Sequence, residues 1–218
     1  MRTKLGTVLI LLGVLFLAGS LGLYLYNDRE DRAAAEASQN LMPQLVEAIV
    51  QRTEEQASQT SPTAPGTGLP GEYAPPEAAV HPEDRVMPIV QVDGYGYIGF
   101  LSIPSLELEL PVMADWSYPQ LRIAPCRYTG DCNRDDLVIM AHNYDHHFGR
   151  LSQLREGDTV ALTDMNAKTI LYTVVALDVL HPQAVDEMTA GDYDLTLFTC
   201  TFGGKSRVTV RCMRTQEN

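Results

Sequence analysis

The chain has 218 residues, 45% of them hydrophobic, which suffices for one ordinary hydrophobic core but hardly for two full domains. Its formal net charge is -12, and no block of Lys or Arg lies beyond the extreme N-terminus, which argues against a nucleic-acid partner. The four cysteines are too few for a disulfide scaffold, and none forms a CxxC pair of the zinc or thioredoxin type. We therefore expect one domain without a metal site.

The first element is an uncharged apolar run at residues 5–26. At 1.5 Å per residue its roughly 22 residues can cross a hydrocarbon core of about 30 Å. Arg2 and Lys4 precede the run, and acidic residues dilute the basic ones after it, so the positive-inside rule predicts that residues 1–4 are cytoplasmic. A cleaved signal peptide is the alternative, because residues 18–20 are small, but the run exceeds the usual apolar region of such peptides.

Two connecting segments are expected between this transmembrane anchor and the folded domain. Residues 27–58 carry apolar side chains at helical spacing around Leu41, Leu45 and Ile49, which predicts a juxtamembrane spacer that can be helical, with a break near Pro43. Residues 59–88 are rich in Pro, Thr, Ser and Gly, as in an extended linker. Together the two segments are expected to hold the domain at a distance from the membrane.

The remaining residues, 89–218, are dominated by short apolar or alternating runs that are typical of strands. Short helices are expected only near residues 148–155 and 118–123. An all-β domain of this kind removes its exposed sheet edges by closing into a small barrel. The predicted strands are Tyr97–Ile103, Leu106–Met113, Asp136–Ala141, Thr159–Thr163, Thr169–Leu180, Asp194–Thr199 and Arg207–Met213.

Three side chains with complementary chemistry stand at the ends of these strands. Cys200 ends one strand, Arg207 opens the next, and His142 directly follows an earlier buried strand. Alone, the cysteine is more often a small core residue than a nucleophile, and a single histidine is usually a satisfied structural group. Together they provide a thiol nucleophile, a proton-transfer group of near-neutral pKa and a cationic donor for an oxyanion, as acyl transfer requires.

The segments around these residues resemble the sortase family. TLFTC at 196–200 is similar to the TLxTC signature of sortases, RVTVR at 207–211 to the strand with their arginine, and LVIMAHN at 137–143 to their histidine element. GYIGFLSIPSLELELPVM at 96–113 and GRLSQLREGDTVAL at 149–162 add weaker matches. The order of histidine, cysteine and arginine is also that of the family.

The resemblance implies a closed eight-stranded sortase-type β-barrel and a cysteine transpeptidase activity. Cys200 would attack the threonine carbonyl of an LPxTG-like sorting signal of a secreted protein, and His142 would transfer protons to and from the amines. Arg207 would hold the oxyanion, and the neighbouring Asn143, Thr199 and Thr201 are assigned to substrate binding. The acyl acceptor would be an amine of the cell wall or of a pilin. No cofactor and no metal is needed for the chemical step.

The sortase subclass does not follow from these motifs. AHN followed by Phe148 resembles class B, but the connection at residues 181–193 is too short for the long helix-bearing loop of that class. The class B sorting motif is therefore not carried over. The pair Asp115-Trp116 follows the second predicted strand, so it does not match the lid that precedes the barrel in other members.

Other functions fit the sequence less well. A metal cluster in HNYDHH, with His142, His146 and His147, lacks an HExxH frame. Papain-like enzymes carry the cysteine before the histidine, and L,D-transpeptidases usually show an HGC-type motif that is absent here. The alternative from another class is a non-catalytic anchored β-domain, an adhesin or assembly factor, in which Cys200 is structural.

Two finer points concern other arginine and cysteine residues. Arg207 and Arg211 lie on one face of a strand, but Arg211 is about 13 Å further from the cysteine end, so only Arg207 should reach the substrate and Arg211→Lys should be nearly silent. Cys126 and Cys132 are spaced so that a disulfide is allowed but not demanded, and such bridges persist outside the cytoplasm.

Overall fold

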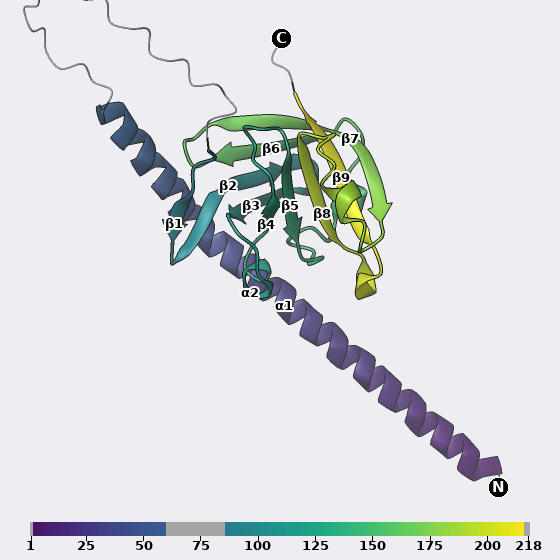
Figure 1. Cartoon of the computed structure of the whole chain (residues 1–218). Coiled ribbons are helices and arrows are strands. Elements are labelled where there is room, and N and C mark those ends of the chain that lie inside the picture. The colour runs from purple at the N-terminus through teal and green to yellow at the C-terminus, as the bar shows by residue number, and fades with distance from the viewer. Residues whose placement is uncertain (1, 60–85, 216–218) are drawn as a thin grey trace, which may run out of the picture.

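The computed structural model describes residues 2–59 and 86–215 and consists of one long helix and a β-barrel that packs against its second half (Figure 1). The long helix is α1 (Arg2–Gln59). The predicted linker at 59–88 lies almost wholly outside the described residues. Its expected extended form therefore stays a prediction.

The barrel is a closed circuit of eight strands. Its order is β2-β3-β4-β5-β8-β9-β7-β6, and a second pairing of β6 with β2 closes the circuit, while the short strand β1 is added to β2. The β3–β4 and β5–β8 pairs are parallel and the others are antiparallel. The strands are β1 (Val90–Val92), β2 (Tyr95–Ile103), β3 (Leu108–Met113), β4 (Cys126–Thr129), β5 (Leu137–Ala141), β6 (Thr159–Asp164), β7 (Thr169–Leu180), β8 (Leu195–Cys200) and β9 (Arg207–Arg214).

The predicted all-β class and eight-stranded closure are confirmed, with details that the sequence did not indicate. β1 and β4 were not predicted, because three or four residues give no recognisable alternation. The predicted helix at 118–123 is found as α2 (Tyr118–Leu121), whereas the one at 148–155 is only a 3₁₀ turn, η3 (Leu151–Gln153). The unpredicted helix is α3 (Val185–Met188), and two further 3₁₀ turns are η2 (Pro104–Leu106) and η4 (Phe202–Gly204).

Closure of the barrel depends on a glycine where β2 meets β6. Gly99 has φ +141° and lies at a register shift in the pairing of β2 with β3. A Cβ at this position would be 1.9 Å from the carbonyl oxygen of Thr163 on β6. Only glycine therefore allows the two backbones to approach closely enough to pair.

The barrel interior holds the main hydrophobic core. Inward-facing branched side chains from every strand of the circuit except β4 fill it, as the alternation of β-strands requires. Representative members, all fully buried, are Ile98, Val112, Ile139, Leu162, Val174, Leu197 and Val210. The outer faces of β4, β5, β8 and β9 are thereby left free to carry other chemistry.

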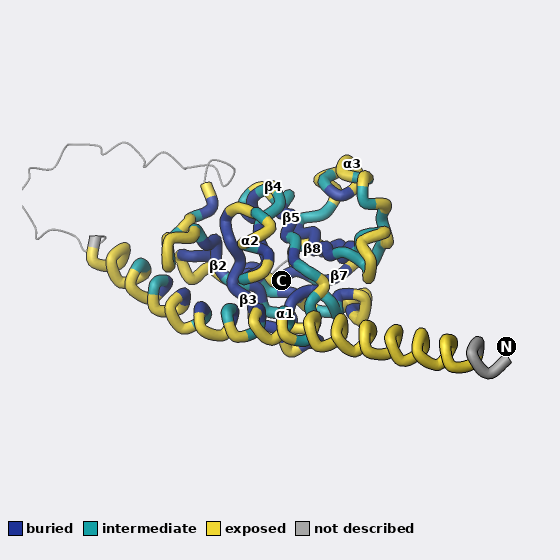
Figure 2. Tube along the Cα trace, turned by 90° about the horizontal axis from the view of Figure 1, so that it is seen from below, coloured by how far each residue is buried: buried dark blue, intermediate teal, exposed yellow. Residues whose placement is uncertain are grey.

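Helix α1 packs along the outside of the barrel, and buried residues recur along its docked part (Figure 2). Ala34, Ser38, Leu41, Leu45 and Ile49 recur every three or four residues and therefore face one side of the helix. The last three form a second core cluster with barrel and loop residues, including Tyr97, Met113, Leu121 and Met165. The spacer predicted for residues 27–58 is thus a docked helix.

Polar contacts fix the helix at both ends of this stripe. Asp31 accepts hydrogen bonds from the backbone N–H of His146 at 3.1 Å and contacts its ring Nδ1 at 2.7 Å. Near the other end, the Arg52 Nε donates to the Asn166 side chain at 2.9 Å. Residues 27–58, expected as a spacer, therefore pack along the barrel itself, and the distance between barrel and membrane stays a prediction.

The helix is also continuous at Pro43, where a break was expected. Pro43 is exposed and lies opposite the packed stripe. Its ring removes one backbone donor on the solvent side, where water can satisfy the free carbonyl. The contacts of Leu41 and Leu45 on either side hold the helix together.

Candidate active site

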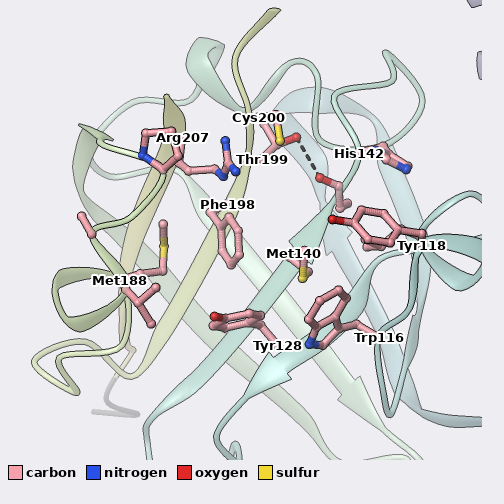
Figure 3. A pocket seen from close by; sticks show the side chains of 15 residues that line it. Trp116, Tyr118, Tyr128, Met140, His142, Met188, Phe198, Thr199, Cys200 and Arg207 are labelled. Atoms are coloured by element: carbon pink, nitrogen blue, oxygen red, sulfur yellow. Dashed lines mark hydrogen bonds between the residues drawn. The ribbon is translucent and has the colours of Figure 1, made fainter. Parts of the chain in front are cut away.

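An apolar groove crosses the outer face of the sheet where β4, β5, β8 and β9 run side by side (Figure 3). Its volume is about 240 Å³. The floor is made by Tyr128, Met140 and Phe198 from three of these strands. The α2 segment forms one wall and the α3 segment the other, and His142, Cys200 and Arg207 stand at one end.

The strand register brings the three predicted site residues together. Cys200, the last residue of β8, pairs directly with Arg207, the first residue of β9. Ala141 at the end of β5 pairs with Thr199 of β8, so His142 emerges beside Cys200. Figure 3 accordingly shows Cys200 between Arg207 and His142. The alternation of side chains places all three on the outer face, with Met140 and Phe198.

Of the three residues assigned to substrate binding, only Thr199 lines the groove. Its hydroxyl donates to the carbonyl oxygen of Ala141 at 2.8 Å and so ties β8 to β5 immediately before His142. The Thr201 hydroxyl contacts the backbone and side chain of Ser206 across the β8–β9 loop. Asn143 is exposed and faces α1 in a separate hollow. Thr199 and Thr201 thus order the backbone around the cysteine.

The two arginines of β9 occupy different environments. The Arg207 guanidinium lines the groove and donates to the carbonyl oxygens of Gly204 and Ser206, each at 3.2 Å. Arg211 is buried and donates to the backbone of Glu187 and Met188 in α3 at 2.7 and 3.2 Å. The sequence predicted only that Arg211 lies too far from the cysteine end to reach the substrate, and its spacing did not indicate these structural contacts.

The three histidines expected as an alternative metal cluster do not share one site. His142 lies in the groove, and burial, together with the charge of Arg122, lowers its pKa below the usual value, so the imidazole is neutral near pH 7. His146 contacts Asp31 of α1. His147 is fully buried beneath α1, with its Nε2 3.5 Å from the Ser38 hydroxyl.

The four cysteines differ in accessibility. Cys200 is partly exposed in the groove, whereas the others are buried. Cys132 lies in the barrel core and Cys126 in the cluster under α1, and both are free thiols, so the structure does not contain the disulfide that their spacing allowed. Burial raises the pKa of the Cys126 thiol to about 12 and that of Cys132 to about 11.

The groove walls were not identified from the sequence. Trp116 and Tyr118 pack edge to face, with ring centroids 6.2 Å apart, and Trp116 also stacks obliquely on Tyr128 at 6.2 Å. Opposite them, Val185 and the buried Met188 close the groove. An exposed aromatic pair in a short loop was the available signal, because such rings commonly mark a recognition surface.

Comparison with solved structures defines the class of the fold. A sortase D5 transpeptidase of Clostridium perfringens is 19% identical, with a TM-score of 0.50 over 55% of this chain and 79% of that one. Sortase C1 of Streptococcus agalactiae is 21% identical, with a TM-score of 0.50 over 56% and 71%. Sortase C1 of Streptococcus suis is 27% identical over 56% and 74%, with a TM-score of 0.48. The domain is a sortase-type β-barrel.

The sequence itself places the chain in a family. The family model of the Sortase domain matches residues 101–215, which include His142, Cys200 and Arg207. No curated protein matches the chain. The chain belongs to the sortase family, whose members are cysteine transpeptidases.

Proposed function

We propose that this protein is a membrane-anchored transpeptidase that cleaves an LPxTG-like C-terminal sorting signal and transfers the acyl group to an amine of the cell wall or of a pilin. The observation that carries the proposal is the register of the groove end. Cys200 is paired with Arg207 and lies beside His142, and all three face the same apolar groove.

The chemical step uses the three side chains in turn. The Cys200 sulfur attacks the threonine carbonyl carbon, and its proton passes to the neutral imidazole of His142. The carbonyl oxygen becomes an oxyanion beside the Arg207 guanidinium, which stabilises it by charge-assisted hydrogen bonds. The C–N bond then breaks, and His142 gives the proton to the departing amine. A thioester between Cys200 and the substrate remains.

The second half reverses these transfers with a new amine. The incoming amine attacks the thioester carbon and loses a proton to His142. As the C–S bond breaks, the thiolate regains that proton. The product, which contains the new amide bond, then leaves the groove. No external oxidant or reductant is required, because no atom changes its oxidation state.

The groove suits an extended peptide with apolar residues ahead of the scissile bond. The floor of Met140 and Phe198 and the aromatic wall of Trp116 and Tyr118 can bury leucine and proline side chains. A groove of this kind favours one short peptide over a folded protein surface, because only a strand-like segment fits between the walls.

Anchoring is supported by the composition of α1. Within the described residues one helix is long and apolar enough to cross a membrane, with a mean hydropathy of 2.5 in its most apolar window, and that window is unburied. Arg2 and Lys4 precede the span, so we propose a cytoplasmic N-terminus and an extracytoplasmic barrel.

A non-catalytic anchored domain with a structural Cys200 is the competing function. Against it stands the position of Cys200, which is partly exposed at the groove end whereas the three other cysteines are buried. A purely structural thiol gains nothing from partial exposure, since its contribution to packing depends on burial.

The test uses the full chain in detergent with a sorting-signal peptide and an amine, followed by mass spectrometry. Cys200→Ala and His142→Ala should each abolish cleavage, and only wild type should gain the mass of the acyl group. Asn143→Ala is the matched control, because Asn143 adjoins His142 in sequence but lies outside the groove. Turnover by Cys200→Ala, with an unchanged circular dichroism spectrum, would refute the mechanism.

A further inference from the structure

Phe202, two residues beyond Cys200, is unusually exposed. Its side chain is 89% exposed, the highest value among the large hydrophobic side chains that the structure describes. The loop that carries it is well held, because Thr201 and Ser206 are bonded across it by three hydrogen bonds of 2.9 to 3.2 Å. Packing within the barrel therefore gives no reason for an aromatic ring here.

The shape of this loop presents the ring outward. Gly203 and Gly204 follow Phe202 with φ of +77° and +71°, a conformation that residues with a Cβ rarely adopt. The tight turn at η4 therefore keeps the ring at the tip, beyond the end of the barrel. In Figure 1 this yellow loop projects from the barrel end that lies toward the N-terminal half of α1.

The same loop lies beside the outer end of the apolar run of α1. Phe202 and Gly203 line a hollow together with Tyr24 and Asn27 of the helix, and Asn143 and Tyr144 complete its barrel side. Burial of α1 residues begins only after this point, since residues 6–27 are all exposed and Asp28 is the first that is not. The loop therefore meets α1 at the point where the helix changes from fully exposed to packed against the barrel.

The helix sets the depth of this contact. The helix rises about 1.5 Å per residue. If the span ends near Tyr26, Tyr24 lies about 3 Å inside that end. Asp31, which is hydrogen-bonded to His146, lies about 7.5 Å outside it. The headgroup zone of one leaflet is itself roughly 5–7 Å thick. A side chain level with Tyr24 and Asn27 thus falls within the interfacial zone, where aromatic rings are enriched.

We infer that the β8–β9 loop is seated on the outer leaflet, with the Phe202 ring in the lipid interface and the cysteine end of the groove facing the membrane. This inference rests on the proposed membrane span. The occupant is a lipid surface, because the loop and the apolar helix meet at one level and no part of the barrel separates them.

Charge does not supply this contact. The chain has a net charge of -12, and Asp28, Asp31 and Asp145 line the same hollow. The acidic chain is therefore repelled by anionic lipids, and the three aspartates of the hollow add to this repulsion. The covalent connection through α1 instead raises the effective concentration of the loop at the surface, so the modest partition of one aromatic ring suffices. Contact through Phe202 should accordingly be weakly dependent on salt.

The position of Cys200 gives this surface a role in substrate choice. Phe202 lies two positions after Cys200, a span of at most about 7 Å along the chain. The thiol thus lies close to the headgroups, and a sorting signal presented at the same membrane reaches it without leaving the surface. A membrane-tethered signal should be processed faster than the same peptide free in solution.

The contact is tested with the full chain in vesicles of phosphatidylethanolamine and phosphatidylglycerol. Tryptophan at position 202 (F202W) should fluoresce at shorter wavelength in vesicles than in detergent and be quenched by lipids brominated near the headgroup. Leu171→Trp is the control, since Leu171 is an exposed residue of β7 close to Thr215 and hence at the opposite end of the barrel. Emission from the native Trp116 is subtracted with the wild-type chain. Absence of quenching at 202, or equal quenching at 171, overturns the inference.

The functional consequence is measured with Phe202→Ser. This variant should cleave a soluble peptide in detergent at the wild-type rate and a vesicle-tethered peptide several-fold more slowly than wild type. Equal losses with both peptides would mean that Phe202 contacts substrate, and no loss with either would remove its role at the membrane. If wild type cleaves neither peptide, the proposed activity fails, but the quenching experiment still decides the membrane contact.

Discussion

Arg211 is the residue whose replacement tests the construction of the groove most directly. Its buried guanidinium donates to the carbonyl oxygens of Glu187 and Met188, to the Thr196 hydroxyl at 3.1 Å and to Asp178 at 3.3 Å. It also lies over the Tyr193 ring at 5.1 Å. One planar group thus fastens α3, which forms a groove wall, to the outer face of β8 and β9.

Arg211→Lys keeps the charge but not the fork of donors, so at most one or two of these bonds can survive. Hydrogen bonds to a charged donor contribute about 1.5–3 kcal/mol each, and the partly exposed Asp178 pair adds little. The loss of two bonds to α3 and β8 should lower the free energy of unfolding by about 3 kcal/mol. Because the wall loosens while Cys200 and His142 stay in place, KM should rise several-fold and kcat should change little.

Urea unfolding and steady-state peptide cleavage measure the two effects on the same preparation. Thr196→Val is the graded control, since it removes one hydrogen bond of the same network and should cost about 1 kcal/mol. An unchanged urea midpoint together with an unchanged KM for Arg211→Lys would refute the fastening role. A fall in kcat at constant KM would instead place Arg211 in the chemical step.

Three further predictions concern Arg207, the buried His147 and the four cysteines. Arg207→Lys should leave the urea midpoint unchanged and lower single-turnover acylation by roughly 10²–10³, as for loss of one oxyanion donor; wild-type acylation would exclude that role. Burial lowers the pKa of His147 from 6.5 to about 4. Between these two pH values the unfolded chain binds more protons than the folded chain does. About 3 kcal/mol of stability, which is present above pH 6.5, is therefore lost as the pH falls to 4. In His147→Phe the urea midpoint should depend less steeply on pH across this range than in wild type. An identical pH dependence in the two proteins would contradict the role given to His147. Near neutral pH the native protein should be alkylated rapidly at Cys200 alone, because the other thiols are buried; these are Cys126, Cys132 and Cys212. Peptide mapping that finds a disulfide between buried thiols, or labelling of any of them before Cys200, would contradict their burial.

The parts of the fold that the sequence predicted are those with a local signal. Alternating apolar residues marked the long strands, and the residues at strand ends placed Cys200 next to Arg207 correctly, because a hairpin fixes its own register. The spacing of Leu41 and Leu45 predicted a helix with an apolar stripe. Local sequence does not indicate which part of the protein such a stripe packs against. The role of Arg211 was missed for the same reason, since its partners in α3 lie more than twenty residues away in sequence.

The substrate-contact assignments for Asn143 and Thr201 rested on adjacency to His142 and Cys200. Adjacent residues of an extended chain point to opposite sides, so proximity in sequence does not imply proximity to a ligand. The aromatic wall at Trp116 and Tyr118 is the reverse case, because these residues are far from Cys200 in sequence but line the same groove. It lies at the start of the short helix α2, ahead of β4, and only closure of the barrel brings it to the groove.

The parallel pairing of β5 with β8 also governs when the thiol can react during biogenesis. Cys200 and Arg207 meet through a tight hairpin and can associate early, whereas His142 joins them only when two strands 58 residues apart align. Such nonlocal pairing forms late in folding, after the entropy of a long loop has been overcome. A chain that has not yet paired these two strands therefore carries Cys200 without His142 beside it. The topology thus delays assembly of the three side chains until the barrel is complete.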